Sequence, residues 1–368
     1  MNLSNQRILK VLNETSKDFY KNKNNKSQKS NHWKTRYRIK EFTMENLINF
    51  RSSNLSSGLD DLADQQDFIS SKMFTDIVDV LTEDYVISNL PKNNIGNCSN
   101  LIKYKNVYLD YNKLAHICWF NDVEKSVLKN NEISNFCEIG GGFGSFSELF
   151  IRNYNLKFLS IDLPEANVMS SYYLKECFPD KRFYLYDNYK ENRFLSYEDF
   201  LNNDIIILPP NLNIDPKIKI DLFINSRSFM EMNFSIIKSY FEFIQNHIKR
   251  NGFFLNINRY DKTSVGENIR ISDYPYDNNW KVITSKPLYN QDWVHFLLTR
   301  RNFVQKEQNV TAELEKIKEI GKPFYGKYVD VNPSLTRILL RRYLLLILGL
   351  RLYDFLNSIR KKLNIFMS

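Results

Sequence analysis

A glycine-rich segment, Glu-Ile-Gly-Gly-Gly-Phe-Gly at positions 138–144, carries the clearest chemical signal in this sequence. Gly140, Gly142 and Gly144 let the backbone turn sharply and approach a ligand closely. The helix expected after them offers free N–H groups and the positive end of its dipole. Asp162 ends the next expected strand, 22 residues after Gly140, where a carboxylate can accept hydrogen bonds from both hydroxyls of a ribose. The spacing therefore predicts a site for a nucleoside-containing cofactor.

The order of the glycines separates the classes of cofactor. A dinucleotide fingerprint G-x-G-x-x-G that starts at Gly140 needs glycine at position 145, where this chain has Ser145. The spacing is instead G-x-G-x-G, and Glu138 stands two residues before the first glycine. A carboxylate there suits a cofactor with an ammonium and a sulfonium better than one with a pyrophosphate. Two alternatives stay open: a nicotinamide-dependent oxidoreductase, against which Ser145 argues, and a glycine turn that serves only packing.

Short apolar runs alternate with helical patterns from residue 135 onward. This alternation is typical of right-handed βαβ units with a parallel sheet, so the predicted fold class is α/β, doubly wound and Rossmann-like. Before residue 135, apolar residues recur at three- and four-residue spacing, which predicts a helical N-terminal region. The expected strands are 135–139, 156–162, 204–210, 219–225, 252–258 and 292–301, and the expected helices include 73–90, 111–128, 145–153, 164–178 and 233–250.

Three sequence blocks add a family resemblance. They read EIGGGFGSFSELF…LSIDLPEANVMSSYYL, then IIILPP, then DLFINSRSFMEM…YFEFI. The region from about 130 to 300 resembles the class I S-adenosylmethionine-dependent methyltransferases, and more narrowly the bacterial sugar O-methyltransferases, with the blocks in that family's order. The resemblance implies a seven-stranded sheet, S-adenosyl-L-methionine as cofactor and a sugar hydroxyl as methyl acceptor. It also implies a role in the biosynthesis of surface polysaccharide or other glycoconjugates.

The resemblance assigns individual residues. The methionine part of the cofactor would lie against Glu138, Gly140, Gly141, Gly142 and Gly144. Asp162 would hold the ribose, and Leu163 would lie against the adenine. Asn225, at the end of the expected strand 219–225, would face the reacting methyl group or the acceptor.

Two further residues are candidates for a general base. Ser228 and Glu231 fit the capping box S-x-x-E, whose ordinary role is to satisfy backbone N–H groups at a helix start. In the alternative interpretation Glu231 takes the proton from the acceptor hydroxyl, because its turn follows the strand beside the transferred methyl. Both roles stay open. His295, on the last expected strand, is the other candidate.

The net charge of +9 suggests nucleic acid, but the basic residues are concentrated at the two ends of the sequence. Residues 1–40 have eleven Lys and Arg against two acids, and residues 337–368 have seven against one. Between them, acidic side chains outnumber basic ones. The sequence therefore predicts no positive groove and no nucleic-acid partner. It also has no clear Cys, His or acidic cluster of the kind that binds a metal, and we expect none.

Composition divides the chain into four regions. These are a basic leader expected to be disordered (1–40), a helical region (41–130), the cofactor-binding domain (131–302) and a helical extension (303–368). The tail at 335–368 has arginines beside a short apolar run, which fits a helix on an anionic membrane surface. The alternative is a helix packed on the domain or on a partner subunit in a homo-oligomer.

Four scattered cysteines and the lack of a signal segment predict a cytoplasmic location for the protein. The membrane-associated alternative is the inner face of the membrane.

The sequence leaves the acceptor open within a class. A free sugar, a sugar nucleotide or a lipid-linked saccharide would each fit the resemblance. A lipid or small-metabolite acceptor is the first alternative. A membrane-associated binding protein without catalysis is the second.

Overall fold

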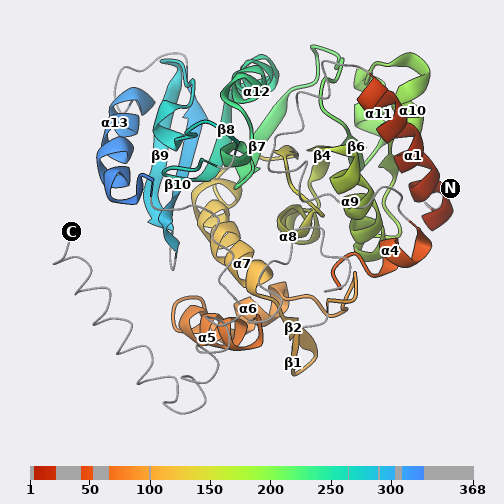
Figure 1. Cartoon of the computed structure of the whole chain (residues 1–368), viewed down its shortest axis with the longest axis horizontal. Helices are drawn as coiled ribbons and strands as arrows, with labels where there is room; N and C mark the ends of the chain where they lie inside the picture. Colours follow the sequence, from red (N-terminus) through yellow and green to blue (C-terminus); the bar gives the residue numbers. More distant parts are fainter. Residues whose placement is uncertain are drawn as a thin grey trace. The chain divides into compact units, whose positions relative to one another are not determined.

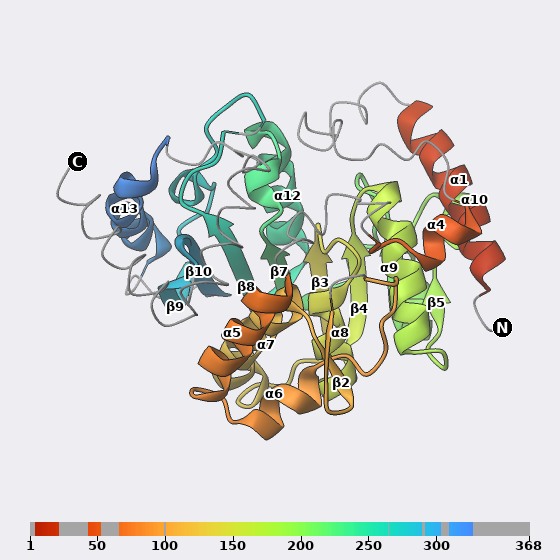
Figure 2. The same cartoon turned by 60° about the horizontal axis from the view of Figure 1, so that its bottom comes forward.

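The computed structural model describes residues 4–21, 43–52, 66–98, 101–263, 265–288, 291–302 and 309–326 (Figure 1). These residues all belong to one compact unit of the chain, Met1–Lys327, and a second unit, Tyr328–Ser368, lies outside the described residues. A mixed sheet runs through the first unit with helices on both of its faces (Figure 2).

Counted over the described residues, the sheet has eight strands in the order β5-β6-β4-β3-β7-β8-β10-β9. The neighbouring strands from β5 to β8 are parallel, and β10 is antiparallel to both β8 and β9. The carboxyl ends of the parallel strands therefore meet at one edge, where open α/β sheets bind their ligands. The strands are β3 (Asn135–Ile139), β4 (Lys157–Ile161), β5 (Phe183–Tyr184), β6 (Ile205–Leu208), β7 (Ile220–Ser226), β8 (Ile248–Arg259), β9 (Trp280–Leu288) and β10 (Gln291–Arg301).

The central strands form because their apolar residues are buried on both faces of the sheet. All four residues of β6 are buried, as are the last four of β3 and of β4. Side chains of α7, α8 and α9 form one core layer, and those of α12 and α13 belong to the other. The helices are α1 (Asn5–Lys21), α4 (Met44–Ile48), α5 (Gln66–Val78), α6 (Glu83–Asn89), α7 (Tyr111–Val123), α8 (Ser145–Tyr154), α9 (Pro164–Cys177), α10 (Tyr186–Asn192), α11 (Tyr197–Asn202), α12 (Phe234–His247) and α13 (Val310–Gly321).

This architecture confirms the predicted doubly wound α/β fold, with three differences of detail. The described sheet has eight strands rather than seven, because the two-residue β5 extends the edge beside β6. The helix expected over 233–250 ends at His247, because β8 already begins at Ile248. Strand β9 is not predicted from the sequence, because its position at the sheet edge leaves most of its residues partly or fully exposed.

Helix α1 shows that the prediction of a disordered leader over 1–40 was wrong for residues 5–21. The polar composition hides an apolar face, since Ile8, Val11 and Phe19 are buried. This face packs on α9 and α10 at the edge of the sheet. The ion pair between Arg7 and Asp187, with N and O atoms 2.8 Å apart, adds a polar contact to α10. Residues 22–42 lie outside the described residues.

The expected helices between residues 41 and 130 are present with more breaks than the pattern indicated. The segment 73–90 divides into α5 and α6, and Thr82 between them has a positive φ of 55°. A hairpin of β1 (Ile102–Tyr104) and β2 (Val107–Leu109) then precedes α7. Helix α7 continues to Leu128 through a π-helical turn, which confirms the helix expected over 111–128.

A buried ion pair joins the end of α4 to the start of α7. Arg51 Nη2 lies 2.5 Å from Asp110 Oδ2, with side chains only 4% and 3% exposed. Burial acts to raise the pKa of Asp110, but Arg51 and the backbone N–H of Lys113 outweigh it, so the pKa of Asp110 is lowered. The carboxylate form therefore stabilises the fold above pH 4 or so, the usual value for aspartate.

We expect Asp110→Asn to lower the free energy of unfolding by about 3 kcal/mol at pH 7, because it removes the charged partner from a buried ion pair with Arg51. Asparagine can still accept the N-cap hydrogen bond that Asp110 takes from Lys113 N, so the change isolates the charge. Urea unfolding at several pH values measures the effect. The difference from wild type should shrink as the pH falls below about 4. A difference that is the same at pH 3 and pH 7 would contradict the ion-pair explanation.

Helix α13 confirms the helical pattern expected in the stretch after residue 303. None of the helices in the described ranges is long and apolar enough to cross a membrane. The tail at 335–368, for which a membrane or packing role is predicted, lies outside the described residues.

Candidate functional site

The glycine segment lies between β3 and α8, at the carboxyl edge of the sheet. Gly140, Gly142 and Gly144 have φ angles of +72°, +60° and +86°, in the left-handed region that favours glycine. The backbone N–H of Gly140 donates to the carbonyl of Ile161, 2.9 Å away at the end of β4. The loop is therefore fixed between the ends of two neighbouring parallel strands.

The turn that follows β7 packs directly on this loop. A Cβ atom on Gly140 would overlap the hydroxyl oxygen of Ser228 and lie 2.5 Å from the Ser228 Cβ. The same atom would lie 3.6 Å from the Met232 Cε. Gly141 has little more room, since a Cβ there would lie 2.7 Å from Glu138 Oε2. Residues 228–232 thus form one wall beside the glycine loop.

Glu138 is fully buried at the carboxyl end of β3. Its Oε1 accepts a hydrogen bond from the Ser226 hydroxyl at 2.9 Å, and its Oε2 accepts one from the Ser147 hydroxyl. Burial raises the pKa of Glu138, although these two hydroxyls act in the opposite direction. The contacts join β3, α8 and β7 around a single acidic side chain.

Asp162 bridges the glycine loop and the start of α9. Its Oδ2 accepts the N–H of Gly142 at 2.8 Å, and its Oδ1 accepts the N–H of Leu163 at 2.7 Å. Burial raises the pKa of Asp162 to about 7 against these two hydrogen bonds, and the charges of Glu138 and Glu165 add to the rise. The charges of two neighbouring carboxyl groups therefore act on Asp162.

The predicted cofactor-binding residues come together in space at the ends of β3 and β4. Leu163 is half-buried and caps α9, where its carbonyl accepts the N–H of Asn167 at 2.9 Å. The structure thus brings the predicted cofactor-binding residues together, while the role of each toward a ligand stays a prediction.

Asn225 lies at the end of β7, fully buried. Its Nδ2 donates to the Ile139 carbonyl at 2.9 Å and to Ser228 Oγ at 3.1 Å. Its Oδ1 accepts from the N–H of Phe229 at 3.0 Å and from Asn258 Nδ2 at 2.9 Å. Both amide hydrogens and both acceptor directions are used within the protein. These contacts favour a structural role at the junction of β3, β7 and β8 over the predicted position facing the acceptor.

The capping box suggested by Ser228 and Glu231 is not formed. The short helix η4 (Phe229–Glu231) has no side-chain cap, because Ser228 Oγ is engaged with Asn225. Glu231 instead accepts a hydrogen bond from Lys262 Nζ at 2.7 Å, with Lys262 only 3% exposed and Glu231 14%. Lys262 thus holds the Glu231 carboxylate, and the role of Glu231 as a base stays a prediction.

His295 lies in β10 and is buried among hydroxyl groups. Its Nδ1 is 2.9 Å from the Tyr260 hydroxyl and its Nε2 is 2.8 Å from the Ser285 hydroxyl. Burial lowers the pKa of His295 to about 4, and the charge of Glu313 acts against this. Within the described residues its hydrogen bonds reach Tyr260, directly after β8, and Ser285 in β9, and not the glycine loop. These contacts favour a structural role for His295.

The sequence analysis missed two charged residues near the site. Lys262 follows β8. Glu165 lies in the first turn of α9, and the Tyr20 hydroxyl donates a hydrogen bond shared between its two carboxylate oxygens, each 2.9 Å away. Each stands within a few residues of the carboxyl end of a strand. A search of all charged residues at those positions would have found both, whereas a search for motifs does not.

No group of three or more His, Cys, Asp or Glu side chains suitable for a metal ion occurs in the described part of the chain.

The parallel strands from β5 to β8 and the glycine loop after β3 define a doubly wound, Rossmann-like α/β fold, with β10 antiparallel between β8 and β9. No protein-family model and no curated protein matches the sequence.

Several solved structures have a similar chain trace over about half of this chain. The mitomycin 7-O-methyltransferase MmcR is 13% identical, with 52% of this chain and 57% of that chain covered and a TM-score of 0.33. The magnesium protoporphyrin IX methyltransferase ChlM from Synechocystis, solved with S-adenosylhomocysteine, is 11% identical over 52% and 84% of the two chains, with a TM-score of 0.35. The N-methyltransferase NodS from Bradyrhizobium japonicum is 12% identical over 50% and 85%, with a TM-score of 0.31. The matched part thus spans little more than half of the first of these proteins.

Proposed function

We propose that this chain is an S-adenosyl-L-methionine-dependent methyltransferase that binds its cofactor over the glycine loop. The observation that carries the proposal is the group of acidic side chains at the loop. Glu138 is fully buried, Asp162 holds the loop through Gly142, and Glu165 is 8% exposed. Carboxylates in a buried site favour a cationic ligand and repel an anionic one. A cofactor with an ammonium and a sulfonium fits this charge, and a pyrophosphate does not.

The loop also leaves hydrogen-bonding capacity for such a cofactor. Gly140 and Gly141 have no room for a Cβ because the side chains of Ser228 and Glu138 occupy that space, so glycine there keeps these side chains packed against the loop. Each oxygen of Asp162 accepts one backbone N–H and keeps a second acceptor direction, which the ribose hydroxyls can use. Leu163 would then lie against the adenine. When bound, the cofactor supplies an electrophilic methyl group.

For the acceptor we propose a sugar hydroxyl, carried by a free sugar, a sugar nucleotide or a lipid-linked saccharide. The resemblance of the three sequence blocks supports this choice. A hydroxyl is a weak nucleophile at neutral pH, and Glu231 on the wall beside the loop would take its proton. Lys262 would orient that carboxylate through its hydrogen bond. We further propose a place in surface polysaccharide or glycoconjugate biosynthesis in the cytoplasm, with the tail at 335–368 as a candidate contact to the membrane or to a second subunit.

Calorimetric titration of the whole chain tests the cofactor. We expect micromolar binding of S-adenosylmethionine and S-adenosylhomocysteine and none of NADH. Asp162→Asn should weaken both by about tenfold or more, because one amide cannot accept all the hydrogen bonds that the carboxylate accepts. Asp204→Asn, which changes an acid paired with Arg182 at the start of β6, is the matched control and should bind like wild type. Binding of NADH alone would overturn the proposal.

A second step tests the acceptor. The protein is incubated with methyl-labelled cofactor and a panel of free sugars, sugar nucleotides, lipid-linked saccharides, lipids and aromatic metabolites. Label in a saccharide product supports the sugar assignment. Label that enters only lipids or aromatic metabolites would keep the methyltransferase and reject the sugar.

A further inference from the structure

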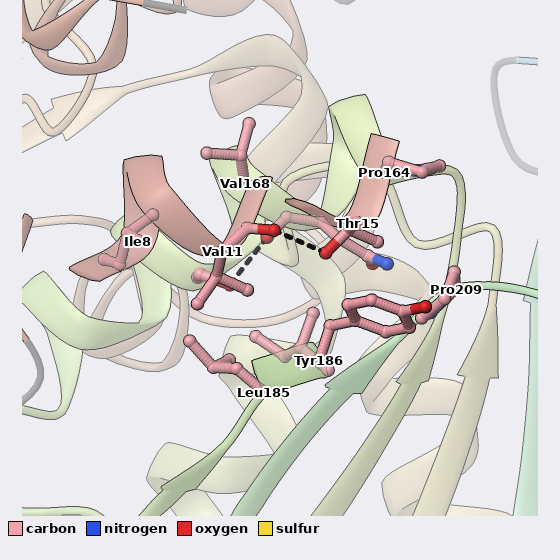
Figure 3. A pocket seen from close by; sticks show the side chains of 11 residues that line it. Ile8, Val11, Thr15, Pro164, Val168, Leu185, Tyr186 and Pro209 are labelled. Atoms are coloured by element: carbon pink, nitrogen blue, oxygen red, sulfur yellow. Dashed lines mark hydrogen bonds between the residues drawn. The ribbon is translucent and has the colours of Figure 1, made fainter. Parts of the chain in front are cut away.

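Helix α1 closes a narrow hollow beside the end of β4 (Figure 3). Val11 and Thr15 of α1 form one wall, and Pro164 of α9, Tyr186 of α10 and Pro209 after β6 form the others. The space among these side chains is about 270 Å³ only when the open solvent at its mouth is included, so no more than the edge of a ligand can enter it. Its lining is mostly apolar. It therefore suits the edge of a flat, weakly polar ring better than a charged or bulky group.

The polar groups of this lining are satisfied within the protein with one exception. Thr15 Oγ1 donates to the Val11 carbonyl at 2.6 Å, and Ser171 Oγ donates to the Asn167 carbonyl at 2.7 Å. Asn167 is only 7% exposed and lines the hollow, yet its Oδ1 has no hydrogen-bond partner among the described residues. A buried acceptor without a donor costs stability, so the position is suited to a donor from a ligand.

The orientation of the Asn167 side-chain amide follows from the hydrogen bond that its nitrogen makes. Asn167 Nδ2 donates to the backbone carbonyl of Asp162 at 2.9 Å. A carbonyl can only accept, so the nitrogen must face Asp162 and the oxygen must be the atom that remains. Asn167 thus contacts Asp162, the residue predicted to bind the ribose, and offers a hydrogen-bond acceptor in the adjoining hollow.

We propose that Asn167 Oδ1 reads the exocyclic amino group of the cofactor's adenine, with the hollow under α1 taking that edge of the ring. This inference rests on the proposed function. If Asp162 holds the ribose, the base attached to that ribose lies within one ring's length of Asp162, on the side of α9. Adenine has apolar faces and an amino group on its edge that only donates, which matches the apolar lining and the acceptor of Asn167. A base with a carbonyl at that position would place two acceptors against each other.

Titration with two probes that differ at this one group tests the inference. S-adenosylhomocysteine carries the amino group, and S-inosylhomocysteine carries a carbonyl oxygen in its place. Wild type should prefer the first by about tenfold or more. Asn167→Leu, which has no acceptor, should bind the two within about threefold of each other. Ser170→Ala removes a hydroxyl that donates to the Asn167 backbone carbonyl at 3.1 Å but does not line the hollow, and it should behave like wild type.

The outcomes separate the inference from the proposed function. Equal binding of the two probes by wild type overturns the role of Asn167 while leaving the methyltransferase proposal intact, and needs no variant. A preference that survives in Asn167→Leu also overturns it, since another group must then read the base. Binding of neither probe by wild type overturns both proposals. Thermal melting of each variant shows that the compared proteins are folded.

Discussion

A Gly140→Ala variant is expected to lose about 3 kcal/mol of unfolding free energy and to bind S-adenosylhomocysteine at least about tenfold more weakly. Two costs add at this position. The backbone has a φ of +72°, which costs an L side chain about 1 kcal/mol or more. The new Cβ would also overlap the Ser228 side chain, and such overpacking costs about 1–3 kcal/mol.

The affinity falls because the loop must move to accept the Cβ. Gly140 N is bonded to the end of β4, and Gly142 N is bonded to the Asp162 carboxylate two residues further on. A hydrogen bond to a charged group contributes about 1.5–3 kcal/mol, so its distortion is sufficient for a tenfold loss. Urea unfolding and calorimetric titration measure the two effects separately.

Two matched variants separate backbone strain from overlap. Gly266 also has a positive φ, +88°, but a Cβ there meets nothing within 4 Å. Gly266→Ala should therefore show only the backbone cost and bind the probe like wild type. Adding Gly140→Ala to a Ser228→Gly background removes the overlapping atoms, and its further cost should fall to that of Gly266→Ala. If Gly140→Ala costs the same in both backgrounds, Ser228 is not the obstacle.

Most of the sheet could be predicted from the sequence because its signals are local. Strands buried on both faces appear as short continuous apolar runs, as in β6. The elements that were missed have mixed surroundings. β9 lies at the edge, and α1 has its apolar residues spread through a polar segment. In both cases burial depends on a neighbour that lies far away in the sequence.

The candidate site divides in the same way. The glycine loop and Asp162 could be predicted, because a positive φ and a strand end leave a local trace in the sequence. The roles of Asn225 and Glu231 could not, because their partners are distant: Ile139 carbonyl and Asn258 for the first, Lys262 for the second. The capping-box motif was misleading for this reason. Its serine is held by the side chain of Asn225, and sequence spacing carries no information about that competition.

The affinity for S-adenosylhomocysteine is expected to fall about tenfold for each pH unit below 7 and to stay level just above it. Burial, with the charges of Glu138 and Glu165, raises the pKa of Asp162 to about 7 in the unliganded protein. The two backbone N–H groups already use one acceptor direction of each oxygen, so the ribose hydroxyls need the ionised carboxylate. Below pH 7 binding must therefore release one proton from the Asp162 carboxyl. Proton linkage then makes the affinity fall about tenfold for each pH unit.

The same linkage has a consequence of opposite sign for the empty protein. Between about pH 4 and 7 the folded state binds a proton at Asp162 that the unfolded state does not, so this group lowers stability as the pH rises. Titrations at pH 6 in buffers of different ionisation enthalpy count the released proton directly. We expect close to one for wild type and close to none for Asp162→Asn, whose affinity should vary little with pH. Glu138 remains in that variant, so a slope that persists there belongs to Glu138 and contradicts the assignment to Asp162.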